Sequence, residues 1–119
     1  MQAGTTYSAI IGSVIKQLRE THSINQGVMA ENMTVSQAAW SKLESGKSTL
    51  STAQLAKVAD LLGIEANKII QYADQTAADF KANGISVSYD NKEAESMGLM
   101  LLGAAAVGAL VAIIILGRK

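Results

Sequence analysis

Apolar residues recur three and four positions apart through most of the first 82 positions, and this spacing predicts amphipathic helices. The pattern predicts helices over residues 8–20, 25–33, 36–44, 51–62 and 65–81. Residues 1–7 are polar, lack the features of a signal peptide and are expected to be flexible. The inward-facing side chains form an expected core of Ile11, Ile15, Leu18, Met29, Met33, Val35, Trp40, Leu43, Leu55, Val58, Ala59, Leu62, Ile64 and Ile69.

Residues that favour helix ends stand at the borders of these segments. Asn25 and Ser36 are expected N-caps, because their side-chain oxygens can accept from a free N–H of the first turn. Ser51 and Gln54 have the spacing of a capping box. Gly46 and Gly63 stand where a helix commonly ends in a left-handed residue. The sequence therefore predicts a tight helix-turn-helix over residues 25–46.

The end of the chain has a different pattern, because residues 96–117 carry no charge. At ~1.5 Å per residue such a helix spans ~33 Å, enough to cross a hydrocarbon core. Residues 97–117 are therefore predicted to form a transmembrane helix, with Arg118 and Lys119 at the headgroups. The alternative is a buried helix of a globular core, which a head this small is not expected to cover on all sides. Small residues at every fourth position suggest pairing of two membrane helices, and these are Ala104, Gly108 and Ala112.

Between the head and the tail, residues 72–96 are expected to extend the fifth helix and then form an acidic linker. The stripe Ile69, Ala73, Thr76 or Ala77, and Phe80 is interpreted as a dimer contact, with packing on the same head as the alternative. Residues 85–89 alternate as a short strand would, either paired across a dimer or as plain linker. Asp90 and Glu93 then favour the start of the last helix.

The amino-acid composition limits the kinds of functional site that the chain can form. The chain has no cysteine and one histidine, and no nucleophile, base and orienting residue stand in a recognisable pattern. An enzyme, a metal site and a bound cofactor are therefore not expected. Ten Lys and Arg balance ten Asp and Glu, so the net charge is zero. Because DNA affinity depends on phosphate neutralisation, a monomer is expected to bind DNA only modestly.

The motif N-Q-x-x-M-A followed by S-Q-A-A-W-S-K-L-E-S-G-K resembles the lambda-repressor-like (XRE/Cro) helix-turn-helix family. The resemblance extends from about Ile11 to Ile70 and implies a compact bundle of five helices over residues 8–71. The expected fold class is thus all-α: this five-helix domain, an extended fifth helix, a short linker and one C-terminal transmembrane helix. Thr34 departs from the pattern, because the family usually has Gly at this turn position.

The resemblance also implies residue roles, with 36–44 as the recognition helix. Gln37 matches a position that contacts a base edge, and Gln pairs with adenine N6 and N7. Ala38 matches a contact to a thymine methyl, while Gln26, Lys47 and Ser48 match backbone contacts. Arg19 and Glu44 match a buried structural ion pair of the family. The complete set of expected DNA-binding residues is Gln26, Ser36, Gln37, Ala38, Ser41, Lys42, Lys47 and Ser48.

Together these features predict a membrane-anchored, sequence-specific transcriptional regulator that binds double-stranded DNA as a homodimer. Its expected location is the bacterial inner (cytoplasmic) membrane, crossed once, with the N-terminal domain in the cytoplasm. The alternative is a RodZ-like protein or another membrane-assembly subunit, in which the head contacts other membrane proteins instead of DNA. Gln37, Ser41 and Lys42 suit base contacts and favour the first hypothesis.

Overall fold

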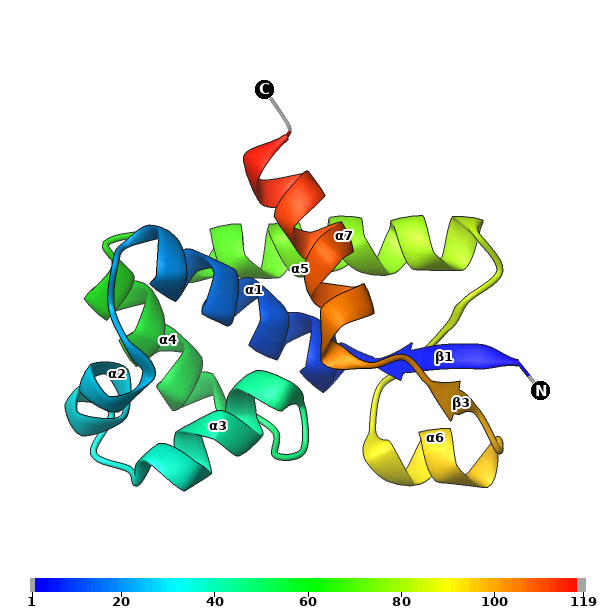
Figure 1. Ribbon diagram of the computed structural model, residues 1–119, viewed down its shortest axis with the longest axis horizontal. Helices are drawn as coiled ribbons and strands as arrows, with labels where there is room; N and C mark the ends of the chain where they lie inside the picture. Colours follow the sequence, from blue (N-terminus) through cyan, green and yellow to red (C-terminus); the bar gives the residue numbers. More distant parts are fainter. Residues whose placement is uncertain (1, 118–119) are drawn as a thin grey trace.

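The computed structural model describes residues 2–117, and Arg118 and Lys119, with their predicted headgroup contacts, lie outside this range. The helices α1 to α4 form one end of the molecule, and α5 runs along the upper part of the view from this end to the other (Figure 1). A small sheet and α6 form the other end, and α7 crosses over α1 and α5. The elements are β1 (Ala3–Thr6), α1 (Tyr7–Thr21), α2 (Gln26–Asn32), α3 (Gln37–Ser45), α4 (Thr52–Leu62), α5 (Ala66–Ala82), β2 (Ser86–Ser88), α6 (Asn91–Ser96), β3 (Met100–Leu101) and α7 (Ala104–Leu116).

The predicted capping residues are confirmed in α2, α3 and α4. The side chains of Asn25, Ser36 and Ser51 accept from the backbone N–H three residues later. The capping box of Ser51 with Gln54 is complete in both directions. Gly46 and Gly63 end their helices with φ of 82° and 67°, in the left-handed region that glycine tolerates best. Local signals therefore determine where these helices begin and end.

The core forms largely where the apolar stripes predict it. Trp40 and Ile69 are fully buried, whereas Val35, Leu55 and Ile64 are only partly buried. The prediction misses two fully buried residues of α1, Ile10 and Val14. The reason is that α1 packs against α3 and α5 and also against α7, so more than one stripe of this helix is covered. Thus α1 is the central helix of the molecule.

The first residues do not form a flexible start. Residues 3–6 form β1, the central strand of a parallel sheet in the order β2-β1-β3. Thr5 pairs with Val87 of β2, and Gly4 pairs with Leu101 of β3. Thr6 ends this strand and caps α1 by accepting from the N–H of Ala9 at 3.1 Å. The strand predicted over residues 85–89 is confirmed in position as β2, but its partner is the N-terminus of the same chain.

The predicted transmembrane helix over residues 97–117 is wrong. Gly98 stops α6 with φ of 64°, the chain then continues as β3, and α7 begins only at Ala104. In between, the N–H groups of Met100 and Leu102 donate to the carbonyls of Gln2 and Gly4 at 2.9 and 2.8 Å. The backbone of this apolar stretch is thus satisfied by a sheet. Within residues 2–117, none of the helices combines the length and the apolar character needed to span a bilayer.

This finding corrects two predictions that depended on the spanning helix, the fold class and the location, and removes the support for a third. The fold is not an all-α head with a membrane tail, because the tail is part of the folded unit and a small sheet joins its two ends. The assignment to the bacterial inner membrane is wrong for the same reason. The RodZ-like alternative and the contacts with other membrane proteins required the same membrane helix.

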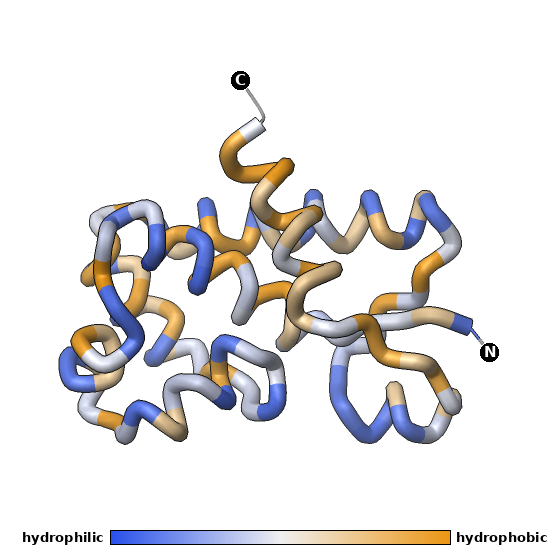
Figure 2. Tube along the Cα trace, in the orientation of Figure 1, coloured by the Kyte–Doolittle hydropathy of each residue, from blue (hydrophilic) through white to orange (hydrophobic). Residues whose placement is uncertain are grey.

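Helix α7 is apolar along its whole length (Figure 2). It packs on α1 and α5 through Val107, Val111 and Ile114, which are buried. The three small residues predicted to pair membrane helices lie elsewhere on α7: Ala104 is exposed, and Gly108 and Ala112 are half-buried. Burying an aliphatic side chain of this size contributes about 1.5–3 kcal/mol, so this face is a substantial part of the core. The alternative of a buried helix is therefore the correct one for this face.

The apolar stripe of α5 is covered within the same chain. Ile69, Ala73, Thr76, Ala77 and Phe80 are all buried, and α5 packs on α1, α4 and α7. The interpretation of this stripe as a dimer contact is therefore wrong, and packing on the same head is confirmed. Helix α7 accounts for the length of α5, because it covers the part that extends beyond a minimal head.

Tyr7 connects the start of α1 to the middle of α5. Its hydroxyl donates to Asp74 Oδ1 at 2.7 Å, and its ring lies 5.8 Å from the ring of Tyr89. Burial, and then the hydrogen bond to Asp74, raise the pKa of Tyr7 far above its ordinary value. The folded protein therefore favours the neutral phenol. The contribution of Tyr7 to the free energy of unfolding is fully present below pH ~10, the ordinary pKa of a tyrosine. It is lost as the pH rises above that value.

Replacing Tyr7 by Phe is expected to flatten the fall in stability above pH ~10, because the variant has no phenol to ionise. The measurement is the melting temperature of both proteins from about pH 8 to 11.5, taken as the difference between them so that other tyrosines and lysines cancel. Tyr89→Phe is the matched control, since Tyr89 is largely exposed. Parallel curves for wild type and Tyr7→Phe would contradict the expectation.

Candidate nucleic-acid interface

Helices α2 and α3 are joined by a tight turn over residues 33–36. Met33 follows α2 and its N–H donates to the carbonyl of Met29 at 2.9 Å, while the N–H of Val35 donates to that of Ala30 at 3.0 Å. Thr34 has φ of 61°, so a β-branched residue occupies the left-handed conformation. The turn thus keeps its compact course without the glycine that the resemblance led us to expect.

Helix α3 has one buried and one polar face. Trp40, Leu43 and Glu44 point into the protein, whereas the side chains on the other face are exposed. The N–H groups of Lys47 and Ser48 both donate to the carbonyl of Lys42, at 2.9 and 3.2 Å, which folds the following loop against the last turn of α3. The predicted DNA-binding residues on α3 and its cap are all exposed, and these are Ser36, Gln37, Ala38, Ser41 and Lys42. Lys47 is also exposed, and Ser48 is half-buried.

A buried charge cluster fixes α3 to α1, as the resemblance implied. Arg19 Nε donates to Glu44 Oε2 at 2.6 Å, and Arg19 Nη2 donates to Glu44 Oε1 at 3.0 Å. Both side chains are less than a tenth exposed. Trp40 Nε1 adds a third donor to Glu44 at 2.7 Å, and Arg19 Nη1 donates to the carbonyl of Ile24 at 2.8 Å. The predicted ion pair is confirmed, and it carries the satisfied hydrogen bonds that a buried pair requires.

Gln26 has a structural role that the sequence did not indicate. Its Nε2 donates to Glu44 Oε1 at 3.0 Å, and its Oε1 accepts from Gln37 Nε2 at 3.5 Å. Gln26 therefore connects the buried cluster to the exposed glutamine at the start of α3. At 3.5 Å the contact with Gln37 is a weak hydrogen bond, and the side chain of Gln37 remains exposed to solvent. The contact depends on the distance between α2 and α3 in the folded protein. No local sequence signal could therefore have revealed the structural role of Gln26.

The close approach of α1 and α3 depends on Gly12. A Cβ atom built on Gly12 would lie 2.3 Å from the carbonyl oxygen of Glu44 and 2.6 Å from that of Leu43. Any larger residue would push the end of α3 away from α1. Gly12 therefore sets the position of α3 together with the charge cluster, and the sequence analysis did not single it out.

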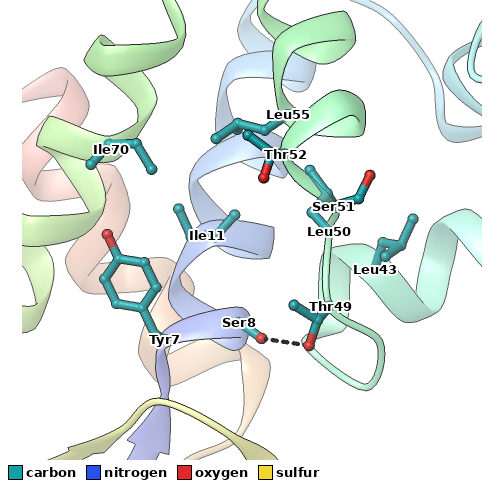
Figure 3. A pocket seen from close by; sticks show the side chains of 10 residues that line it. All are labelled: Tyr7, Ser8, Ile11, Leu43, Thr49, Leu50, Ser51, Thr52, Leu55 and Ile70. Carbon is teal, nitrogen blue, oxygen red and sulfur yellow. Dashed lines mark hydrogen bonds between the residues drawn. The ribbon is translucent and has the colours of Figure 1, made fainter.

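A cavity of about 400 Å³ lies beside the loop that follows α3 (Figure 3). Apolar side chains of α1, α4 and α5 line it, including Ile11, Leu55 and Ile70. Ser8 and Thr49 are hydrogen-bonded to each other at 3.2 Å at its edge. Its lining contains neither a Lys or Arg nor a carboxylate. Among residues 2–117, no three His, Cys, Asp or Glu gather in a way that could hold a metal ion.

The second half of the chain reaches the end of α3. Asn91 Nδ2, at the start of α6, donates to the carbonyl of Gly46 at 3.3 Å. Lys47, Asn91 and Glu95 line one recess together with Leu102. In Figure 1, α3 and α6 lie on the same side of the molecule. The predicted acidic linker is thus in part a folded element next to the candidate interface.

The tight turn between α2 and α3 and the exposed polar face of α3 are features of a helix-turn-helix protein. Residues 10–68, about half of the chain, match a family model described as a helix-turn-helix domain. This part of the chain is therefore a helix-turn-helix domain of the DNA-binding type.

Two solved structures are similar to this chain. A structure of the clp gene regulator ClgR from Corynebacterium glutamicum is 25% identical with a TM-score of 0.62, covering 65% of this chain and 82% of that one. A second ClgR structure from the same organism is 24% identical with a TM-score of 0.56, covering 59% and 91%, and supports the fold alone. No curated protein matches the chain.

Proposed function

We propose that this protein is a sequence-specific, DNA-binding transcriptional regulator of the XRE/Cro type. The observation that carries the proposal is the exposed polar face of α3, whose first residue, Gln37, is connected through Gln26 to the buried pair of Arg19 and Glu44. The buried pair fixes the position of α3, and this supports base recognition, because a helix already held in position loses less entropy on binding. The similarity to the clp gene regulator supports the same function.

The proposed contacts divide into base contacts and backbone contacts. Helix α3 enters the major groove, where Gln37 pairs with an adenine and Ala38 contacts a thymine methyl. Ser41 and Lys42 contact the groove further along the helix. Lys47, Ser48 and the cap residue Ser36 contact the phosphates.

Charge favours a dimer as the active form. The described head has little net charge, since residues 2–71 contain Lys and Arg at 16, 19, 42, 47, 57 and 68 and Asp and Glu at 20, 31, 44, 60 and 65. A single head therefore neutralises few phosphates. Two heads on a pseudo-palindrome, with half-sites about 34 Å apart, double the contacts. The buried stripe of α5 is not free for this contact, so the dimer uses another surface.

Gln37→Ala is expected to weaken binding to the preferred site by ~1–3 kcal/mol while leaving binding to random DNA nearly unchanged, because Gln37 contacts base edges and not phosphate. The preferred site is first selected from random duplexes with the wild-type protein. Dissociation constants for the selected and a scrambled duplex are then compared at one salt concentration.

Gln71→Ala serves as the matched control, since Gln71 is an exposed glutamine on α5. Equal losses on both duplexes would show that Gln37 does not contact bases. Failure of the wild-type protein to select any sequence would overturn the proposed function itself.

A further inference from the structure

Helix α6 is held firmly beside the end of α3. The side chain of Asp90 caps α6 by accepting from the N–H of Glu93, and Ala94 is almost fully buried under the sheet end of the molecule. Strands β2 and β3, on either side of α6 in the chain, both pair with β1. Asn91 adds the hydrogen bond to Gly46, the residue that ends α3. The position of α6 relative to α3 is therefore fixed by the fold and not by a loose tether.

The exposed surface of α6 is acidic. Asp90, Glu93 and Glu95 are exposed and only Lys92 opposes them, which leaves two net negative charges on this short element. Glu95 lines the same recess as Lys47, one of the cations expected to meet phosphate. Helices α3 and α6 are on one side of the molecule (Figure 1), so a duplex that lies along α3 and the following loop also approaches α6.

We propose that α6 is an electrostatic brake on DNA binding, meaning that its carboxylates oppose the phosphates adjoining the contact of α3. This inference rests on the proposed function of α3. Two effects act in the same direction. Glu93 and Glu95 repel any phosphate that comes within a Debye length of ~8–10 Å. Glu95 lines the same recess as Lys47 and lowers the positive potential around that lysine. Both effects are independent of DNA sequence, so the brake lowers non-specific binding and leaves recognition to the base contacts of α3.

The test is a double variant of the full chain, Glu93→Gln with Glu95→Gln. These substitutions keep side-chain size, and both side chains are exposed, so α6 retains its cap and its buried Ala94. We expect the variant to bind random duplex DNA roughly three to ten times more tightly at ~0.1 M salt, and the gain to shrink at ~0.5 M. Binding to the selected site is expected to tighten by a similar factor.

The matched control is Asp60→Asn with Glu65→Gln. It changes the net charge by the same amount at exposed positions around the junction of α4 and α5, and α5 lies across α1 from α3 (Figure 1). The control is expected to change affinity by less than about twofold. Equal gains in the two double variants would show a general effect of net charge and overturn the brake.

Unchanged affinity of the α6 variant, with a wild type that binds DNA, would also overturn the brake while leaving the proposed function intact. If neither the wild type nor the variants bind DNA, the proposed function fails and this inference with it. A second measurement isolates the part of the effect that passes through Lys47. Lys47→Gln is expected to cost more affinity in the α6 variant than in the wild type, because Lys47 is then free to contact phosphate.

Discussion

Glu44→Ala and Arg19→Ala are each expected to lower the free energy of unfolding by ~3–5 kcal/mol. Each substitution leaves the other charge buried without its partner. Glu44→Ala has a further cost, because Arg19, Trp40 and Gln26 all donate to its carboxylate. The measurement is denaturant unfolding of the full chain near neutral pH, supported by melting temperatures.

Glu31→Ala is the control for this prediction, since Glu31 is an exposed glutamate on α2. Arg19→Lys is informative as well, because a lysine has a single charged end and cannot reproduce the two-pronged contact of Arg19 with Glu44. An unchanged stability of Glu44→Ala would mean that the cluster contributes nothing to the position of α3. Loss of DNA binding without loss of stability would instead make it part of the recognition surface.

Val111→Asp is expected to destabilise the protein by several kcal/mol, because it places an unpaired charge at a fully buried position of α7. Ile113→Asp, two residues further along the same helix, is expected to be tolerated, since Ile113 is 65% exposed. The two variants have the same change in charge and nearly the same change in hydropathy. Denaturant unfolding and amide hydrogen exchange of α1 and α5 distinguish them.

This pair of variants tests the role assigned to α7. If α7 packs on α1 and α5, then Val111→Asp raises hydrogen exchange in those helices and Ile113→Asp does not. Equal tolerance of both changes would show that α7 does not contribute to the folded unit. An equal loss of stability in both variants would mean that the face of α7 around Ile113 is also covered in the folded protein.

The sequence by itself determined the head. Its helices are bounded by side chains that act within three or four residues, such as Asn25, Ser36 and the capping box of Ser51, so their ends follow from local chemistry. The apolar stripes predicted most of the core for the same reason, since a helix has a fixed period. The pairing of Arg19 with Glu44 came from the family resemblance and is confirmed by the structure.

Only the tertiary structure shows how the two ends of the chain fold. Hydropathy measures how apolar a segment is, and this quantity is the same whether lipid or protein covers it. Residues 97–117 therefore looked like a membrane helix, although Gly98 and Gly103 divide them and α7 packs by one face on α1 and α5. The sheet of β1 with β2 and β3 joins residues more than 80 positions apart, and no local signal encodes such a contact.

The same reason applies to the candidate interface. The exposed residues of α3 could be named from the motif, because they are the positions that face away from Trp40 and Leu43. Three other features could not be predicted from the motif. They are the hydrogen bonds from Glu44 through Gln26 to Gln37, the close contact at Gly12 and the acidic helix beside Gly46. Each depends on the distance between elements that are remote in sequence, and only the packing of the whole chain sets that distance.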